Sequence, residues 1–82
     1  MQNPNQLNND GILFAQNGDY KKAISCFKKA IEIKNDNPIF WLNLGITYRD
    51  FNKIDLAIEA TLQAHKLDLQ NHEITNTLVQ LF

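Results

Sequence analysis

The chain repeats its own pattern with a period of 34 residues. When the sequence is shifted by this amount, Gly11 falls on Gly45, and the apolar and helix-breaking positions around the two glycines coincide. The other coincident pairs are Pro4 with Pro38, Leu7 with Trp41, Asn9 with Asn43, Phe14 with Tyr48, Tyr20 with Ile54, Ala23 with Ala57, Ile24 with Ile58, Ala30 with Ala64 and Ile33 with Leu67. A recurring unit of this length is typical of a solenoid, in which each unit buries its apolar face against its neighbour.

Each unit is predicted to hold two helices joined by a turn. Apolar residues recur at spacings of three and four, and no stretch shows the alternation of a half-buried strand. We expect a first helix from Pro4 to the break at residues 17–18 and a second between Asp19 and the break at residues 35–38. Three more are expected over residues 38 to about 51, 54 to about 68, and 72–82. The side chains that favour the N-cap position before four of these helices are Asn3, Asp19, Asn37 and Asn71. Gly18 and Asn52 stand where the turns need a left-handed backbone.

The stretch from Trp41 to Tyr48 has the pattern W-x-x-L-G-x-x-Y. This spacing places Trp41, Leu44, Gly45 and Tyr48 on one side of a helix, three of them large and one without a side chain. Glycine inside a helix costs about 1 kcal/mol relative to alanine. We therefore expect that a neighbouring helix comes very close at Gly45.

Both units resemble the tetratricopeptide repeat family, whose pattern is W-x2-L-G-x2-Y, then A-x3-F and a later Ala. The first unit matches at Gly11, Phe14, Ala23, Phe27 and Ala30, and the second at Trp41, Leu44, Gly45, Tyr48, Ala57 and Ala64. Departures from the pattern are Leu7 in place of Trp, Asp10 in place of Leu, Thr61 in place of the aromatic residue and His65 in place of an aliphatic one. The acidic Asp10 indicates that the outer side of the first unit is exposed.

The resemblance implies an all-α fold of antiparallel helix pairs stacked as a right-handed solenoid of five helices. The single domain would hold one repeat over residues 4–37 and a second over 38–71, with 72–82 as a capping helix or the start of a third repeat. The helix expected at the Gly45 gap is the following one, near Ala57, because members of the family pack this way.

Composition excludes several classes of function. The 82 residues carry a net charge of −1, which gives no overall attraction to nucleic acid or membranes. No apolar run approaches the roughly 20 residues of a membrane span, and the first residues lack the features of a signal peptide. Cys26 is the only cysteine, so no intrachain disulfide can form. We expect an intracellular, cytoplasmic protein.

Catalysis is not expected. The nucleophile and imidazole candidates are Ser25, Cys26, His65 and His72, and none has a partner at the spacing of a known motif. Neighbouring lysines could lower the pKa of the Cys26 thiol, but an inert, structural cysteine is the preferred interpretation. The two histidines lack a ligand pattern for a metal, so neither a metal nor a cofactor is predicted.

The resemblance also implies a concave groove, lined by the first helix of each pair, that binds peptides. Asn9 and Asn43 each stand two residues before a glycine, and a ladder of amides can both donate to and accept from a peptide backbone. The alternative is that they are simply polar positions in an Asn-rich chain. Other groove candidates are Asn5, Asn8, Ile12, Ala15, Gln16, Ile39, Leu42, Ile46, Arg49, Asp50, Glu73, Asn76, Thr77 and Gln80.

Two further features of this groove bear on its ligand. Ile39, Leu42 and Ile46 form a second apolar stripe on the third helix, which is either buried or contacts a partner. Some members of the family grip a carboxylate with Lys and Arg, but the corresponding positions here are Asn8, Glu73 and Thr77. Arg49 is the only basic residue among the candidates, so we do not expect a carboxylate clamp.

The sequence therefore predicts a non-catalytic protein–protein interaction module that binds a peptide or protein segment. The alternative is an interaction or oligomerisation fragment of a larger enzyme, such as a glycosyl- or sulfo-transferase. The apolar residues Leu78, Leu81 and Phe82 of the last helix predict self-association, because an end helix of a solenoid needs a polar outer face.

Overall fold

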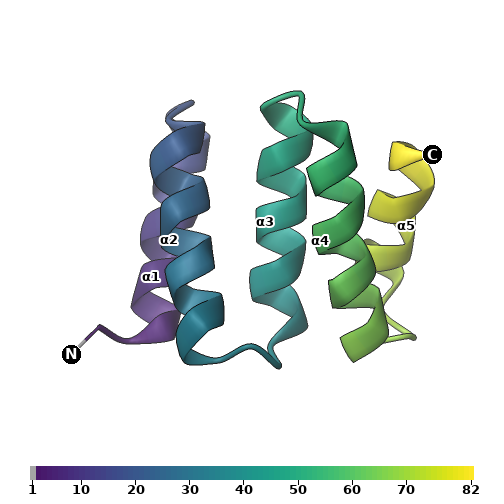
Figure 1. Ribbon diagram of the computed structural model, residues 1–82, viewed down its shortest axis with the longest axis horizontal. Coiled ribbons are helices and arrows are strands. Elements are labelled where there is room, and N and C mark those ends of the chain that lie inside the picture. The colour runs from purple at the N-terminus through teal and green to yellow at the C-terminus, as the bar shows by residue number, and fades with distance from the viewer. Residues whose placement is uncertain (1) are drawn as a thin grey trace.

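The computed structural model describes residues 2–82, which form five helices in a row (Figure 1). They are α1 (Pro4–Gln16), α2 (Tyr20–Ile33), α3 (Pro38–Asp50), α4 (Ile54–Leu67) and α5 (His72–Leu81). Consecutive helices run antiparallel, with α1 and α2 at one end of the row and α5 at the other. Residues 2–82 contain no strand. The predicted all-α helical-repeat solenoid is confirmed.

Local side-chain chemistry sets where the helices begin and end. Four predicted caps form, because an Oδ1 accepts from the backbone N–H two or three residues later at Asn3, Asp19, Asn37 and Asn71. Gly18 and Asn52 have φ of 80° and 63°, the left-handed conformation predicted for both turns. α4 starts after Lys53, which makes no side-chain cap bond. α3 and α4 each end one residue earlier than predicted, with Phe51 and Asp68 as their C-caps.

α3 is the central helix, since it contacts each of the other four. The main core lies between the first two helix pairs and is filled by apolar side chains of α1 to α4. Its buried members are Leu7, Ala23, Phe27, Ala30, Ile31, Phe40, Leu44, Tyr48, Ala57 and Ala60. A smaller cluster of Leu42, Ala64 and Ile74 joins α5 to α3 and α4. α5 thus packs on the second pair as α3 packs on the first.

Both repeated glycines lie where a following helix comes close. A Cβ on Gly45 would overlap the Thr61 hydroxyl and lie 3.3 Å from the carbonyl oxygen of Ala57. A Cβ on Gly11 would lie 2.7 Å from the ring of Phe27. Real Cβ atoms do not approach neighbours so closely, so each glycine is required by packing. The predicted approach at Gly45, near Ala57, is confirmed.

The helices form two layers. α1 and α3 contact each other, as do α3 and α5, so the first helices of successive units lie side by side. α2 and α4 form the second layer and make no such contact with each other. None of the five described helices is long and apolar enough to cross a membrane.

Candidate functional site

A hollow of about 230 Å³ lies between α1 and α3, on the layer of first helices. Its lining comes from three helices and comprises Ile12, Ala15 and Gln16 of α1, Phe27 of α2, and Asn43, Ile46, Thr47 and Asp50 of α3. Six of these eight residues are among the groove candidates that the sequence predicted. The repeat brings them together because α1 and α3 occupy the same position in successive units.

The hollow combines an apolar floor with a polar rim. Phe27 is 1% exposed and forms the floor, while Ile12, Ala15 and Ile46 are half-buried around it. Gln16 and Asp50 are exposed at the rim. Sites that bind small groups or peptide side chains are commonly built in this way, with a few polar groups placed around an apolar surface. The hollow between α1 and α3 has this kind of mixed lining.

Asn43 is held in place by a hydrogen bond between the two units. Its Nδ2 donates to Oδ1 of Asn8 over 2.9 Å, and Asn8 itself is only 9% exposed. Within residues 2–82 this is the one side-chain hydrogen bond of Asn43, so its Oδ1 can still accept from a ligand. Asn8, predicted to line the groove, instead works as a buried support for Asn43.

Asn9 and Asn43 line different hollows. Asn9 lies with Asn5 beside the start of α1, in a separate and mostly polar hollow that also includes Gln2, Asn3, Gln6, Leu7 and Asp10. The two asparagines occupy equivalent positions in register, but the direct amide contact joins Asn43 to Asn8. Joint binding of a ligand backbone by Asn9 and Asn43 therefore stays a prediction.

The second apolar stripe of α3 divides into three environments. Leu42 is 1% exposed and packs against Ala64 and Ile74, so α5 covers it and it belongs to the core. Ile46 lines the hollow, and Ile39 is 40% exposed near the start of the helix. Burial is thus the outcome for Leu42, which the sequence placed in the groove. Residues of α5 explain the difference, because Ile74 fills the space over it.

Arg49 is already engaged by neighbouring side chains. Its Nε lies 3.3 Å from Oδ1 of Asp50, and its Nη1 donates to Oε1 of Gln80 over 3.0 Å. The second bond ties α3 to α5. The one basic candidate of the groove is therefore already paired with a neighbouring carboxylate and with Gln80.

Sequence reasoning missed two residues of the hollow, Phe27 and Thr47. Thr47 is buried, and its hydroxyl donates to the backbone oxygen of Asn43, so it supports α3 and has no donor left for a ligand. Phe27 is on the second helix of its pair, which the family pattern assigns to packing. The signal that could have found it is the register, because Phe27 lies directly under Gly11.

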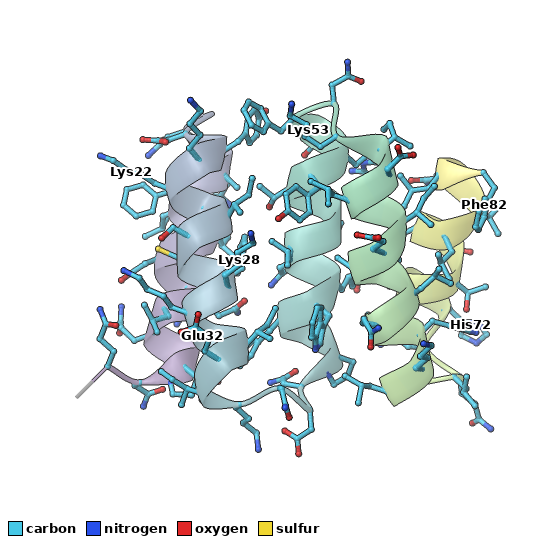
Figure 2. All side chains as sticks on the ribbon, in the orientation of Figure 1. Lys22, Lys28, Glu32, Lys53, His72 and Phe82 are labelled. Carbon is cyan, nitrogen blue, oxygen red and sulfur yellow. The ribbon has the colours of Figure 1, made fainter. Side chains whose placement is uncertain are left out.

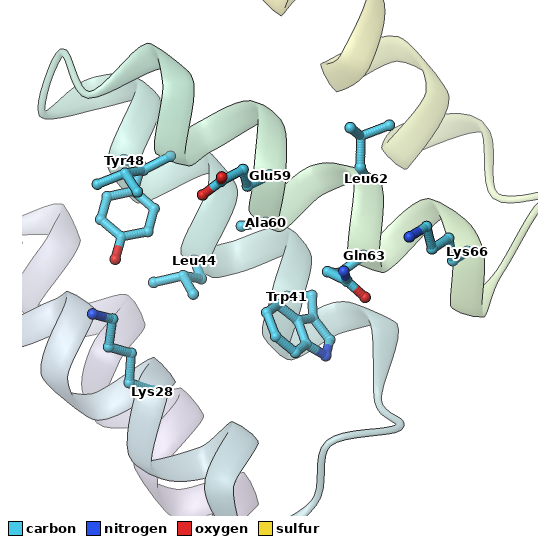
Figure 3. Close-up of a pocket in the computed structure, with 10 residues that line it drawn as sticks. Lys28, Trp41, Leu44, Tyr48, Glu59, Ala60, Leu62, Gln63 and Lys66 are labelled. Atoms are coloured by element: carbon cyan, nitrogen blue, oxygen red, sulfur yellow. The ribbon is translucent and has the colours of Figure 1, made fainter.

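A larger hollow of about 440 Å³ lies on the other layer, between α2 and α4 (Figure 3). Trp41, Leu44 and Tyr48 form its floor, and Lys28 reaches over it from α2 (Figure 3). Trp41 is anchored there by a 2.9 Å hydrogen bond from Nε1 to the backbone oxygen of Asn35. The rim mixes both signs of charge and offers no convergent polar set, so the hollow between α1 and α3 is the better candidate.

Cys26 and His65 are both half-buried. Burial raises the pKa of the Cys26 thiol, the carboxylate of Asp10 raises it further, and Lys29 acts in the opposite direction. Lys29 thus lowers the pKa of the thiol, as the sequence suggested for the nearby lysines, but burial and Asp10 outweigh it. His65 is half-buried, and its Nδ1 has no hydrogen-bond partner within residues 2–82. The described part of the chain contains no cluster of three or more metal-ligating side chains.

Comparisons with known proteins agree with this geometry. A family model described as "TPR repeat" matches residues 11–50, and one described as "Tetratricopeptide repeat" matches residues 39–71. The chain is 41% identical over 58 residues to the TPR repeat-containing protein MJ1428 of Methanocaldococcus jannaschii, which covers 71% of the chain. It is 35% identical over 71 residues to the peroxisomal targeting signal receptor of Candida albicans, which covers 78% of the chain.

These alignments span only 10% and 12% of the two relatives' lengths. Among solved structures, the second TPR of Spaghetti (RPAP3), bound to the HSP90 peptide SRMEEVD, superposes with a TM-score of 0.92 at 22% identity. That match covers 98% of this chain and 74% of the other, and it shows that the two share a fold. From the matched repeats and the aligned relatives, the chain belongs to the tetratricopeptide repeat family.

Proposed function

We propose that this chain is a non-catalytic binding module that holds an extended peptide or protein segment along α1 and α3. The observation that carries the proposal is the hollow whose apolar floor is Phe27, with Ile46 half-buried beside it, and which Asn43 and Gln16 also line. An apolar ligand side chain would enter the hollow, and the Asn43 amide would bind the ligand backbone. A hydrogen bond from Asn43 to the ligand backbone does not depend on the ligand sequence. The apolar floor of the hollow would therefore supply the preference for an apolar ligand side chain.

Two comparisons support a peptide as the ligand. The Candida albicans relative is named as the receptor for a peroxisomal targeting signal. The Spaghetti (RPAP3) structure holds the peptide SRMEEVD. The aligned segment of the first protein and the superposed fold of the second correspond to the repeats of this chain. Exposed Ile39, at the start of α3, would extend the apolar contact beyond the hollow.

The charges of the groove favour a neutral or basic segment. Asp50 lines the hollow, Arg49 is paired with it, and Glu73 is exposed on α5. An acidic peptide such as SRMEEVD would bring its carboxylates to a surface that has no free cation among these groove candidates. Like charges across an interface suppress binding, whereas opposite charges favour it. We therefore propose an internal segment without an acidic end as the ligand class.

A peptide display screen tests the proposal. Random heptapeptides would be selected on the immobilised chain, and the recovered sequences measured by fluorescence anisotropy. The expected result is enrichment of peptides with one apolar anchor and no excess of acidic residues. Asn43→Ala should weaken their binding about tenfold, the effect of one lost hydrogen bond to a buried backbone group. The peptide SRMEEVD is the comparison ligand and should bind more weakly than the selected peptides.

Controls separate binding from folding. Asn43→Ala also removes the partner of the buried Asn8, so its helicity is compared with that of the wild type by circular dichroism. Gln16→Ala changes an exposed rim residue with no described core contact, and should weaken binding without changing helicity. Asn35→Ala alters an exposed asparagine outside the hollow and should leave binding unchanged. If Asn43→Ala and Gln16→Ala bound the selected peptides as tightly as the control Asn35→Ala does, a role for this groove would be contradicted.

We further propose that binding takes place in the cytoplasm, which fits a lone thiol that cannot form an intrachain disulfide.

We also propose that the chain self-associates at its α5 end, away from the groove. Two of the three residues predicted for this contact are less available than expected, since Leu78 is buried and Leu81 half-buried. Phe82 is 83% exposed and supports the proposal.

A further inference from the structure

The hollow between α2 and α4 takes no part in the proposed groove. Its lining residues all belong to α2, α3 and α4, so residues 2–82 contain both of its sides. They are Lys28, Trp41, Leu44, Tyr48, Leu56, Glu59, Ala60, Leu62, Gln63 and Lys66. The groove lies on the layer of α1, α3 and α5, whereas this hollow lies on the layer of α2 and α4. A ligand in one site therefore leaves the other site open.

Apolar surface is exposed around the floor of this hollow. Leu44 and Tyr48 are buried in the core, and Trp41 lies half-buried beside them. Leu56 and Leu62 of α4 are 42% and 38% exposed at the same hollow. Covering such a surface is favourable, because it removes apolar area from water. The floor therefore favours an apolar side chain as its occupant.

Two lysines border the floor on different sides. Lys28 comes from α2 and Lys66 from α4. Figure 3 shows Leu44 and Trp41 between them. Neither lysine belongs to an ion pair within residues 2–82, and Glu59 is the one acidic residue of the lining. The lining thus has two cations against one anion, and their spread around the floor suits a chain segment better than a small molecule.

Lys28 is directed at the hollow by its position on α2. Figure 2 shows its side chain pointing from α2 toward α3, whereas Lys22 points away from α3. In register, Lys28 corresponds to Leu62 of α4, so the repeat accepts an apolar residue at this position. The lysine therefore adds a charge that the packing of the repeat does not require.

The two layers of helices carry opposite net charge. With histidine counted as neutral, α2 and α4 together carry +2, from five lysines against three acids, whereas α1, α3 and α5 carry −2, from one arginine against three acids. The charged residues of α2 and α4 are Lys21, Lys22, Lys28, Lys29, Glu32, Asp55, Glu59 and Lys66. Those of the other layer are Asp10, Arg49, Asp50 and Glu73. Because opposite charges favour association, the layer of α2 and α4 attracts an acidic partner and the groove layer does not.

We infer that the hollow between α2 and α4 is a second docking surface, which binds an acidic protein segment that carries an apolar side chain. The apolar side chain would cover Trp41, and carboxylates on either side of it would pair with Lys28 and Lys66. A protein segment can place a neutral residue opposite Glu59, which the uniform charge of a nucleic acid cannot. The inference goes beyond the proposed function, because it assigns a ligand of different charge to a different layer.

Trp41 reports directly on this hollow, because it is the only tryptophan and lies on the floor. The probe is a capped heptapeptide of glutamates with one central phenylalanine. Its titration into the full chain should produce a saturable change in tryptophan fluorescence, with a dissociation constant on the order of 0.1–1 mM. Added salt should weaken binding, because it screens the ion pairs. Peptides with alanine in place of phenylalanine, or lysine in place of glutamate, should bind at least about tenfold more weakly.

Charge variants test the ion pairs. Lys28→Glu should weaken binding of the acidic peptide at least about tenfold, because it replaces an attraction with a repulsion. Lys29→Glu makes the same change at an adjacent exposed lysine that does not line the hollow, and should weaken binding less. Glu59→Gln should strengthen binding about two- to fivefold, a gain that a folding defect would not produce.

Apolar variants test the floor. Leu56→Ser removes an apolar side chain from the lining and should weaken binding about three- to tenfold. The matched control is Leu67→Ser, because Leu67 lies on the same helix, is equally exposed at 42% and is outside the lining. It should leave binding unchanged. Circular dichroism checks that both variants keep the helicity of the wild type.

Three outcomes would overturn the inference. The first is the lack of saturable binding up to about 5 mM, both by tryptophan fluorescence and by anisotropy of a labelled peptide. The second is equal binding by a thymidine oligonucleotide of the same charge, which would indicate a general polyanion surface. The third is equal loss of binding in Lys28→Glu and Lys29→Glu, which would remove the hollow as the site.

The groove variant separates this surface from the proposed function. Asn43→Ala should leave the acidic peptide bound while it weakens the peptides selected on the groove. Parallel loss of both ligands would mean one shared site and would overturn the second surface. If the display screen recovers no groove peptide, the proposed function fails, and the titration of the acidic peptide still decides this inference.

Discussion

The two helix pairs of this chain share one backbone design but fill it with different side chains. In α1 and α2 the close approach is between Gly11 and the ring of Phe27. In α3 and α4 the equivalent residues are Gly45 and Thr61, and the Thr61 hydroxyl donates to the backbone oxygen of Ala57 over 2.7 Å. Position in the repeat thus decides that two helices meet, while residue type decides what fills the space between them.

The same contrast appears on the groove side. Leu42 is covered by α5 and becomes part of the core, whereas Asn8, one repeat earlier, is a buried amide bound to Asn43. Equivalent positions therefore serve as core in one pair and as polar support in the other. The candidate groove exists because the first pair supplies the Phe27 floor and the second pair supplies Asn43 and Ile46.

Phe27→Ala is expected to have the largest effect on the first pair. The ring is 1% exposed, packs under Gly11 and forms the floor of the hollow. Its removal should lower the free energy of unfolding by about 3–5 kcal/mol, the usual cost of truncating a buried phenylalanine. Urea denaturation followed by circular dichroism measures the change.

The matched truncation in the second pair is Thr61→Ala. It removes one methyl group and one satisfied hydroxyl, so its cost should be about 1–2 kcal/mol. If Thr61→Ala lowered the free energy of unfolding as much as Phe27→Ala, the two pairs would not differ in how the contact between their two helices is stabilised. Both variants should remain helical enough for the transition to be followed.

Gly45→Ala tests how closely α3 and α4 pack at Gly45. Alanine favours helix by about 1 kcal/mol, but its Cβ would overlap the Thr61 hydroxyl, and overpacking typically costs 1–3 kcal/mol. We expect a net loss of up to about 2 kcal/mol in the free energy of unfolding. In a Thr61→Ala background the loss should shrink, because the overlapping hydroxyl is gone.

A double-mutant cycle in urea denaturation measures this coupling, which should reach at least about 0.5 kcal/mol for residues in contact. The corresponding cycle in the first pair combines Gly11→Ala with Phe27→Leu. Equal costs of Gly45→Ala with and without the Thr61 hydroxyl would show that the close approach is not what destabilises the variant.

The fold was predictable because the residue types within each repeat determine the helix ends, the turns and the close helix contacts. The caps at Asn37 and Asn71, the left-handed turn at Asn52 and the approach of Gly45 to Ala57 all follow from residue type and register. Such features depend on a few neighbouring residues. The family pattern then indicates how the pairs stack.

The candidate site was predictable only in part, because it depends on side chains from different helices. Burial of Leu42 follows from Ile74 of α5, and support of Asn43 follows from Asn8 of α1. Neither contact leaves a signal in the local pattern of the residue concerned. The raised pKa of Cys26 also reflects tertiary burial, whereas the sequence shows only the lysines nearby.

The helix starts offer a smaller contrast between the pairs. Asp19 caps α2 by accepting from the backbone N–H of Lys22, while the equivalent Lys53 makes no cap bond for α4. Lys53→Asp should raise the free energy of unfolding by about 0.5–1 kcal/mol, through the new cap and a favourable charge at the helix N-terminus. A loss of the contact between Lys53 Nζ and the Phe51 ring, 5.7 Å apart, offsets part of the gain.

Thermal and urea unfolding measure the change, with Asp19→Ala as the reverse experiment. That variant should lose about 1 kcal/mol, within the usual range for a removed cap. Lys53→Ala is the control, because it removes the cation without adding a cap. A Lys53→Asp chain no more stable than Lys53→Ala would show that capping does not distinguish the two pairs.

The smallest expected effect concerns Cys26, whose equivalent in the second pair is the buried Ala60. Burial, reinforced by the carboxylate of Asp10, raises the pKa of the thiol. At neutral pH the nucleophilic thiolate is therefore scarcer than in an exposed cysteine, and iodoacetamide should react slowly. The matched control is Ser25→Cys in a Cys26→Ser background, since Ser25 is exposed on the same helix.

The raised pKa also fixes the sign of the pH dependence. The folded chain holds this proton more tightly than the unfolded chain, so the stability that the thiol contributes is complete below the unfolded pKa. It is lost as the pH rises through the folded pKa, in the alkaline range. The stability difference between wild type and Cys26→Ala should thus be constant near neutrality and decline at high pH. Asp10→Asn should speed alkylation at fixed pH, and an unchanged rate would remove Asp10 as a cause of the raised pKa.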